Sequence, residues 1–187
     1  MQFFTIQRIL GLLLVIFSST QIPPMIVSII YADSAFEPFF YAFAITLISG
    51  IVLWLPVKNY KRELRLRDGF LVVVLFWSVL GIFGAIPFIL STQVNISTTD
   101  AIFESISGLT TTGATVIESL DTLPKSILYY RQQLQWLGGM GIIVLAVAIM
   151  PMLGIGGMQL YRAETPGPIK DNKLTPRITE TAKALWY

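Results

Sequence analysis

The chain has 187 residues, of which 54% are hydrophobic and only 13% charged, with a net charge of +2 and a mean hydropathy of +0.69. A soluble domain carries about 25% charged residues, so this composition excludes a soluble globular protein, and its hydrophobicity excludes a disordered one. Because the sequence contains no His and no Cys, zinc sites, disulfide scaffolds and Cys-His or Ser-His-Asp catalysis are excluded, and the small net charge argues against binding of nucleic acid.

Four charge-free stretches are long enough to cross a membrane, which takes about 20 apolar residues for a hydrocarbon core of about 30 Å. They cover residues 9–32, 38–57, 69–90 and 132–161. The first stretch also has the features of a signal peptide. It lacks a small-x-small cleavage site, however, and the apolar run resumes through Ile30, so we expect a retained span that Pro23 and Pro24 kink. The sequence therefore predicts an all-α integral membrane protein with four transmembrane helices.

The basic residues are distributed unevenly between the loops. Arg8, the loop 58–68 and the tail 162–187 together hold every Lys and Arg except Lys125 and Arg131. Basic residues in short loops stay on the cytoplasmic side, so we expect both termini in the cytoplasm. The basic loop is explained by this topology together with contact to anionic headgroups.

Residues 98–107 are predicted to form a helix of half a membrane's thickness. Ser97 is a candidate N-cap with Asp100 three residues later, and the helical spacing is carried by Ala101, Ile102, Ile106 and Leu109. Ten residues span about 15 Å, which indicates a re-entrant pore helix. Asp100 is expected to favour the helix N-terminus through the helix dipole, whereas the role of Glu104 is open; neither is assigned as an ion ligand.

The Thr-rich run 110–115 is predicted to be an extended loop. Consecutive β-branched residues favour extended backbone, and Gly113 permits angles that other residues avoid. Unpaired carbonyls at membrane depth are tolerated when they line a wet cavity, and potassium channels use such carbonyls to replace the ion's water. The run is therefore a candidate selectivity filter. The alternative, a Thr-rich outer turn that binds no ion, stays open.

The fourth stretch is longer than a straight crossing and rich in glycine. Gly138, Gly139 and Gly141 suit close helix packing, and Pro151 with the glycines that follow it in 150–157 predicts a bend that is a candidate gate.

These elements together resemble a known family. The sequence Ser107-Gly108-Leu109-Thr110-Thr111-Thr112-Gly113-Ala114-Thr115, followed by a helix that opens Gln135-Trp136-Leu137-Gly138-Gly139-Met140-Gly141, is similar to the first M1-P-M2 repeat of a Trk/Ktr potassium transporter. The first two spans resemble the additional N-terminal hairpin of the TrkH type. The resemblance implies a hairpin over 1–67, a pore repeat over 68–161 (M1 69–90, pore helix 98–107, filter 110–115, M2 127–161), and over 162–187 a cytoplasmic loop with the start of a next repeat.

The resemblance also implies a function without covalent chemistry, and so no enzyme and no cofactor. The carbonyls of Thr111, Thr112 and Gly113 would face potassium, with Thr110 and Ala114 next along the path. The implied protein is a homodimer in the bacterial inner membrane, gated by a cytosolic nucleotide-binding ring of the TrkA type. Whether sodium or protons are coupled to potassium stays open.

One departure from the family concerns the number of repeats. The family joins four repeats in one chain, whereas this sequence holds one and would supply one quarter of a filter. Its ending, 179–187, has the character of an interrupted helix, so we expect a fragment of a longer protein. The second function left open is a membrane assembly subunit whose Thr-rich segment is only an outer loop.

Overall fold

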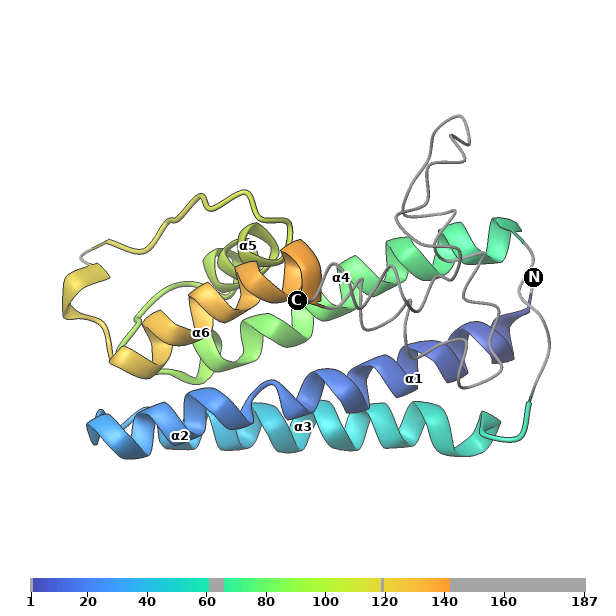
Figure 1. The fold of residues 1–187 in the computed structure, drawn as a ribbon, viewed down its shortest axis with the longest axis horizontal. Helices are drawn as coiled ribbons and strands as arrows, with labels where there is room; N and C mark the ends of the chain where they lie inside the picture. The colour runs from blue at the N-terminus through green and yellow to red at the C-terminus, as the bar shows by residue number, and fades with distance from the viewer. Residues whose placement is uncertain (1, 61–65, 119, 142–187) are drawn as a thin grey trace, which may run out of the picture.

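The computed structural model describes residues 2–60, 66–118 and 120–141 (Figure 1). Over these residues the regular structure is entirely helical, as predicted. The helices are α1 (Phe3–Ser19), α2 (Ile22–Tyr31), α3 (Phe36–Trp54), the 3-10 turn η1 (Leu55–Val57), α4 (Leu66–Leu90), α5 (Thr98–Leu109), the 3-10 turn η2 (Leu120–Thr122), α6 (Lys125–Trp136) and the π-helical turn η3 (Leu137–Gly141).

Three of the predicted membrane spans are present as helices of sufficient length and hydropathy. They cover Phe3–Tyr31, Phe36–Val57 and Leu71–Leu90. Their outward faces carry large exposed apolar side chains, as expected for helices that contact lipid. Examples are Ile26, Phe40, Ile48, Val74 and Ile82. The fourth predicted span begins with α6. The part of it beyond Gly141, with the bend predicted at 150–157, and the predicted loop 162–187 lie outside the described residues.

The first span differs from the prediction of one kinked helix over 9–32. It begins earlier, at Phe3, and consists of two helices that break at Thr20 and Gln21. The two prolines that follow occupy the first turn of α2, where a missing N–H leaves no hydrogen bond unmade. Because Pro24 cannot donate to the Thr20 carbonyl four residues before it, that oxygen accepts instead from Gln133 Nε2 of α6 at 2.9 Å.

The interior of the bundle is organised around Tyr130 of α6. Its ring centroid lies 5.3 Å from that of Phe39 on α3 and 5.3 Å from that of Phe88 on α4, and the side chain is fully buried. The Tyr130 hydroxyl donates to the Gly84 carbonyl at 3.0 Å and accepts from Gln21 Nε2 at 3.1 Å. A buried hydroxyl that both donates and accepts has no unpaired polar group, so Tyr130 joins α3, α4, α6 and the break between α1 and α2 with its polar group satisfied.

The helices are arranged so that α5 enters the bundle from one end and stops partway. The start of α1, the end of α3 and the start of α4 lie at one end of the molecule (Figure 1). The end of α2 and the starts of α3 and α6 lie at the other end, and the chain reaches α5 from that side. After α5 the chain returns toward the end from which α5 entered. This course agrees with the prediction of a re-entrant helix.

Asp33 joins the α2–α3 connection to the start of α6. Its Oδ2 accepts from the Ser126 N–H at 2.8 Å, and its Oδ1 accepts from the Ser28 hydroxyl at 2.6 Å and from the Ala35 N–H at 3.2 Å. Burial raises the pKa of Asp33, but hydrogen bonds from Ser28, Ser126 and Ala35 lower it, and the net pKa lies below the ordinary value of 3.8. These bonds favour the charged form of the carboxyl group.

Replacing Asp33 with asparagine is expected to lower the stability of the full-length protein by about 1 kcal/mol, at the low end for bonds to a charged group because the carboxylate is partly exposed. In either orientation the asparagine NH2 group, which is a donor, would face other donors: the Ser126 N–H on one side, or the Ser28 hydroxyl and the Ala35 N–H on the other. Because the folded pKa lies below 3.8, the contribution of Asp33 is present above that pH and is lost as the pH falls through the folded value. Thermal unfolding in detergent, measured from about pH 5 to about pH 3, checks both effects.

Glu37→Gln is the matched control, since Glu37 is an exposed carboxylate in the first turn of α3. A wild-type midpoint and an unchanged pH dependence in Asp33→Asn would contradict the role of this junction.

Candidate functional site

The candidate site is built on α5, whose start is fixed by its N-cap. The Ser97 hydroxyl accepts from the Asp100 N–H at 3.2 Å and donates to Asp100 Oδ2 at 2.7 Å. The N-cap predicted at Ser97 is thus confirmed, and this bond satisfies one of the helix's unpaired donors. The helix ends at Leu109, two residues beyond the predicted end.

The buried face of α5 is small and polar rather than the apolar stripe that predicted the helix. Ala101 and Leu109 are buried, but Ile106 is 40% exposed. Glu104, Ser105 and Gly108 lie on the buried face together with Ala101 and Leu109. The reason is the close approach of α4 and α6: a Cβ on Gly108 would lie 3.0 Å from the Cβ of Leu134.

The chain reverses direction directly after α5. The Thr111 N–H donates to the Gly108 carbonyl at 2.9 Å, and the Thr112 N–H donates to the Ser107 carbonyl at 3.0 Å. Thr111 and Gly113 have positive φ angles of 57° and 72°. The predicted extended loop over 110–115 therefore begins with a tight turn, and the chain runs without helical structure over 112–118. Left-handed backbone at a threonine is strained and persists only where neighbouring bonds hold it.

Ser107 holds the first part of the returning chain. Its carbonyl accepts from the N–H groups of Thr112 and Gly113, and its hydroxyl donates to the Ala114 carbonyl at 2.7 Å. The Thr110 hydroxyl donates to the Ile106 carbonyl at 2.8 Å and lies 2.9 Å from the Thr112 hydroxyl.

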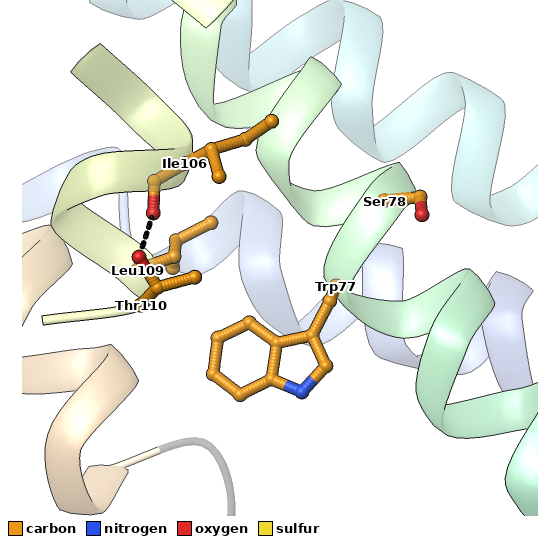
Figure 2. A pocket seen from close by; sticks show the side chains of 5 residues that line it. All are labelled: Trp77, Ser78, Ile106, Leu109 and Thr110. Atoms are coloured by element: carbon orange, nitrogen blue, oxygen red, sulfur yellow. Dashed lines mark hydrogen bonds between the residues drawn. The ribbon is translucent and has the colours of Figure 1, made fainter. Parts of the chain in front are cut away.

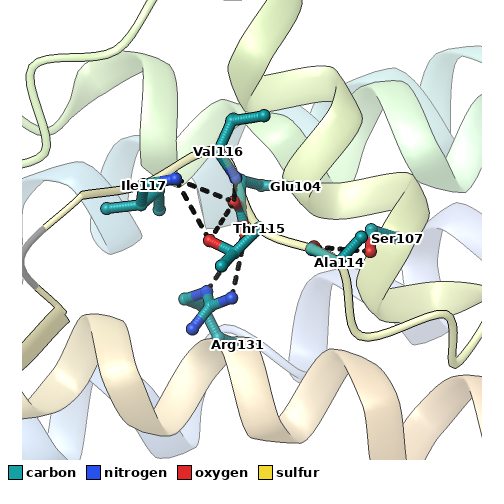
Figure 3. Close-up of polar contacts among 7 residues, drawn as sticks. All are labelled: Glu104, Ser107, Ala114, Thr115, Val116, Ile117 and Arg131. Atoms are coloured by element: carbon teal, nitrogen blue, oxygen red, sulfur yellow. Dashed lines mark hydrogen bonds and ion pairs between the residues drawn. The ribbon is translucent and has the colours of Figure 1, made fainter.

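The second part of the returning chain is held by Glu104, one turn earlier on α5 (Figure 3). Its Oε1 accepts from the Thr115 hydroxyl at 2.5 Å, the Val116 N–H at 2.7 Å and the Ile117 N–H at 3.3 Å. Its Oε2 accepts from Nε and Nη2 of Arg131, both at 3.1 Å. Glu104 is 3% exposed and Arg131 8%. We name residues 115–117 the return segment.

Sequence reasoning missed this pair. It left the role of Glu104 open and placed Arg131 among the outer residues that flank a span, whereas Arg131 lies inside α6. One signal was available: Glu104 follows Ala101 by three residues and precedes Gly108 by four, so it shares their helix face. A carboxylate on a face of small residues is buried and needs a partner.

The five residues predicted to face an ion fall into two groups. Within the part of the chain that the structure describes, the carbonyl oxygens of Thr111, Thr112 and Gly113 accept no hydrogen bond, and all three residues are exposed. The Ala114 carbonyl, by contrast, accepts from Ser107. Thr110 caps α5 and its hydroxyl is engaged, but its carbonyl also accepts no hydrogen bond within the described residues. The carbonyls of Thr111, Thr112 and Gly113, with that of Thr110 beside them, are thus available to coordinate a cation without its water.

A shallow pocket of about 130 Å³ lies beside this turn (Figure 2). It is lined by Trp77 and Ser78 of α4 and by Ile106, Leu109 and Thr110. The lining holds no carboxylate or basic side chain. Among the described residues there is also no group of three His, Cys, Asp or Glu side chains that could hold a metal ion. The oxygen atoms present at the turn are backbone carbonyls and threonine hydroxyls.

Comparison with known proteins places these features in a family. Residues 36–187 match the TrkH family, described as cation transport protein. The chain is 64% identical over its whole length to the Trk system potassium uptake protein TrkH of Vibrio parahaemolyticus and 61% identical to that of Escherichia coli K12, of which it covers 39% and 38%. The fold is similar, with a TM-score of 0.79 and 57% identity, to the crystal structure of the potassium transporter TrkH from Vibrio parahaemolyticus, covering 100% of this chain and 36% of that one. The chain thus spans well under half the length of these relatives.

Proposed function

The chain belongs to the TrkH family of cation transport proteins, and from that premise we propose that it takes part in potassium uptake by supplying one quarter of a channel-like selectivity filter. The single observation that carries the proposal is the turn at Thr111, Thr112 and Gly113, whose carbonyls accept no hydrogen bond within the described chain. The relatives named as potassium uptake proteins support potassium as the ion.

The position of the turn supports the same function. It lies at the inner end of a half-length helix, so its carbonyls are carried to the depth at which a dehydrated ion needs substitutes for water. The chain directly after the turn is held by side chains of α5: Ser107 binds the Ala114 carbonyl, and Glu104 binds the Val116 N–H. Preorganised oxygens need not be reoriented when the ion arrives, which favours selective binding.

The remaining parts of the pore come from outside this chain. We propose that further repeats of the full-length protein, or other copies, complete the ring. The proposal also includes the domain division 1–67, 68–161 and 162–187, both termini in the cytoplasm of a bacterial inner membrane, a homodimer and a cytosolic nucleotide-binding ring of the TrkA type as regulator.

Cysteine labelling at position 112 tests the proposal. Thr112→Cys in the full-length protein, freed of other cysteines, is expected to react slowly with a water-soluble thiol reagent when potassium is present. At a potassium concentration ten times the dissociation constant, occupancy of the site slows the reaction about tenfold, and sodium at the same concentration does not.

Thr92→Cys serves as the control, because Thr92 is exposed and lies in the connection between α4 and α5. Equal reactivity at position 112 with and without potassium would overturn the filter assignment and favour a membrane assembly subunit with a Thr-rich outer loop.

A further inference from the structure

We propose that Glu104 and Arg131 form a positioning pair that sets the ion selectivity of the filter by fixing the return segment. This inference rests on the proposed function, since it concerns the geometry of the same turn. Neither side chain would touch the ion. The pair would act through the backbone of residues 114–117, which connects it to Gly113.

The first support is the division of labour between the two carboxylate oxygens of Glu104. Among the described residues, Oε1 accepts from the return segment alone and Oε2 from Arg131 alone. The three bonds from the return segment to Glu104 therefore converge on one atom, whose position is fixed from the opposite side by the guanidinium; the Ile117 N–H also donates to the Thr115 hydroxyl oxygen at 3.1 Å. Charge-assisted hydrogen bonds of this kind are about twice as strong as neutral ones.

The second support is the burial of the pair. At 3% and 8% exposure, the two charges are shielded from screening by water and salt. Removing one member of a buried pair leaves the other charge uncompensated, which makes such pairs intolerant of change on one side. The position of the return segment is thus coupled to the position of α6.

The third support is the short path from the pair to the free carbonyls. Thr115 is bound to Glu104, and the preceding Ala114 carbonyl is bound to Ser107. Only Gly113, at a φ of 72°, separates this fixed stretch from Thr112. If Thr115 moves, the carbonyls of Thr112 and Gly113 move with it, and a site made of carbonyls discriminates between ions by the number and placement of its oxygens.

The chemistry of an amide provides a sharp test. In Glu104→Gln, the one remaining carbonyl oxygen can face the return segment or Arg131, but the NH2 group then faces donors on the other side. Arg131→Gln alone leaves the Glu104 carboxylate without its cation. In the double variant, the amide oxygen introduced at position 104 can accept from the return segment while the amide NH2 at that position donates to the amide oxygen introduced at position 131. That second oxygen would stand about where Arg131 Nε lies, 3.1 Å from Glu104 Oε2.

The experiment measures the ratio of rubidium to sodium uptake by the full-length protein in proteoliposomes, which does not depend on the amount of protein. Each single variant is expected to lower the ratio about tenfold, as loss of outer-sphere partners does at metal sites. The double variant is expected to restore most of it. Glu118→Gln, which neutralises an exposed carboxylate next to the return segment, is the control and keeps the wild-type ratio.

Three results would overturn the inference. One is a wild-type ratio in both single variants, and another is a double variant whose loss equals the product of the two single losses. The third concerns the case in which Glu104→Gln does not accumulate in the membrane. The double variant then decides: its absence from the membrane overturns the inference, whereas its accumulation with the wild-type ratio supports the pair. A wild-type protein without preference for rubidium over sodium would instead show that the proposed function fails.

Discussion

Replacement of Gly113 by aspartate is expected to abolish selective potassium uptake by the full-length protein. Gly113 has a φ of 72°, and a Cβ built on it meets no atom within 4 Å. The loss would therefore not come from a collision inside the chain. It would come from the cost of left-handed backbone for an L-residue, about 1–2 kcal/mol, and from a carboxylate placed beside the three carbonyls. A fixed anion there changes the field that an ion meets and draws water into the site.

Gly113→Ala separates the two causes, because alanine introduces the backbone strain without the charge. We expect it to retain uptake at a reduced ratio of rubidium to sodium, whereas Gly113→Asp loses the ratio altogether. Uptake of the two ions is measured in proteoliposomes containing equal amounts of each variant. Aspartate at this position with an undiminished ratio would show that the carbonyls of this turn do not coordinate the ion.

Replacement of Gly138 by alanine is expected to have the largest effect on stability. A Cβ at this position would overlap the Leu109 carbonyl oxygen and would lie 2.6 Å from the Leu109 carbonyl carbon and 2.9 Å from its Cα. All three atoms are backbone at the end of α5, so no side-chain rotation can relieve the contact. Overpacking costs about 1–3 kcal/mol even where side chains can yield, and we expect at least the upper end of that range.

The neighbouring glycine offers a matched control. A Cβ on Gly139 would lie 3.6 Å from Thr111 Cγ2, an ordinary contact, so Gly139→Ala should fold normally. Membrane abundance and the thermal unfolding midpoint of the purified full-length protein distinguish the two variants. Equal midpoints would mean that α5 and η3 do not approach each other as closely as described.

The contact between Gly138 and Leu109 also shows how η3 supports the turn that follows α5. Leu109 is the last residue of α5, and Thr110 and Thr111 follow it. The close approach of Gly138 to Leu109 therefore places η3 directly against the start of the turn. A larger residue at position 138 is expected to displace the turn as well as to destabilise the fold.

The sequence by itself determined those features whose physical cause is local. A run of apolar residues long enough for a membrane predicts a helix wherever it occurs, and α3 and α4 follow the predicted spans to within three residues. The N-cap at Ser97 depends on bonds within four residues, so spacing along the chain was sufficient to predict it. The same holds for Gly113, whose freedom to adopt a positive φ angle was evident from the sequence.

Only the tertiary structure decided which distant polar groups meet. The Thr20 carbonyl accepts a hydrogen bond from Gln133, Asp33 accepts one from Ser126, and Glu104 accepts one from Arg131. Each group is buried or partly buried and needs a partner, but its need does not specify which of several candidates along the chain will satisfy it. That choice depends on how the helices cross. Because of that crossing, Glu104, whose role was open from the sequence, and Arg131, which the sequence placed at the boundary of a span, form the pair that holds the return segment.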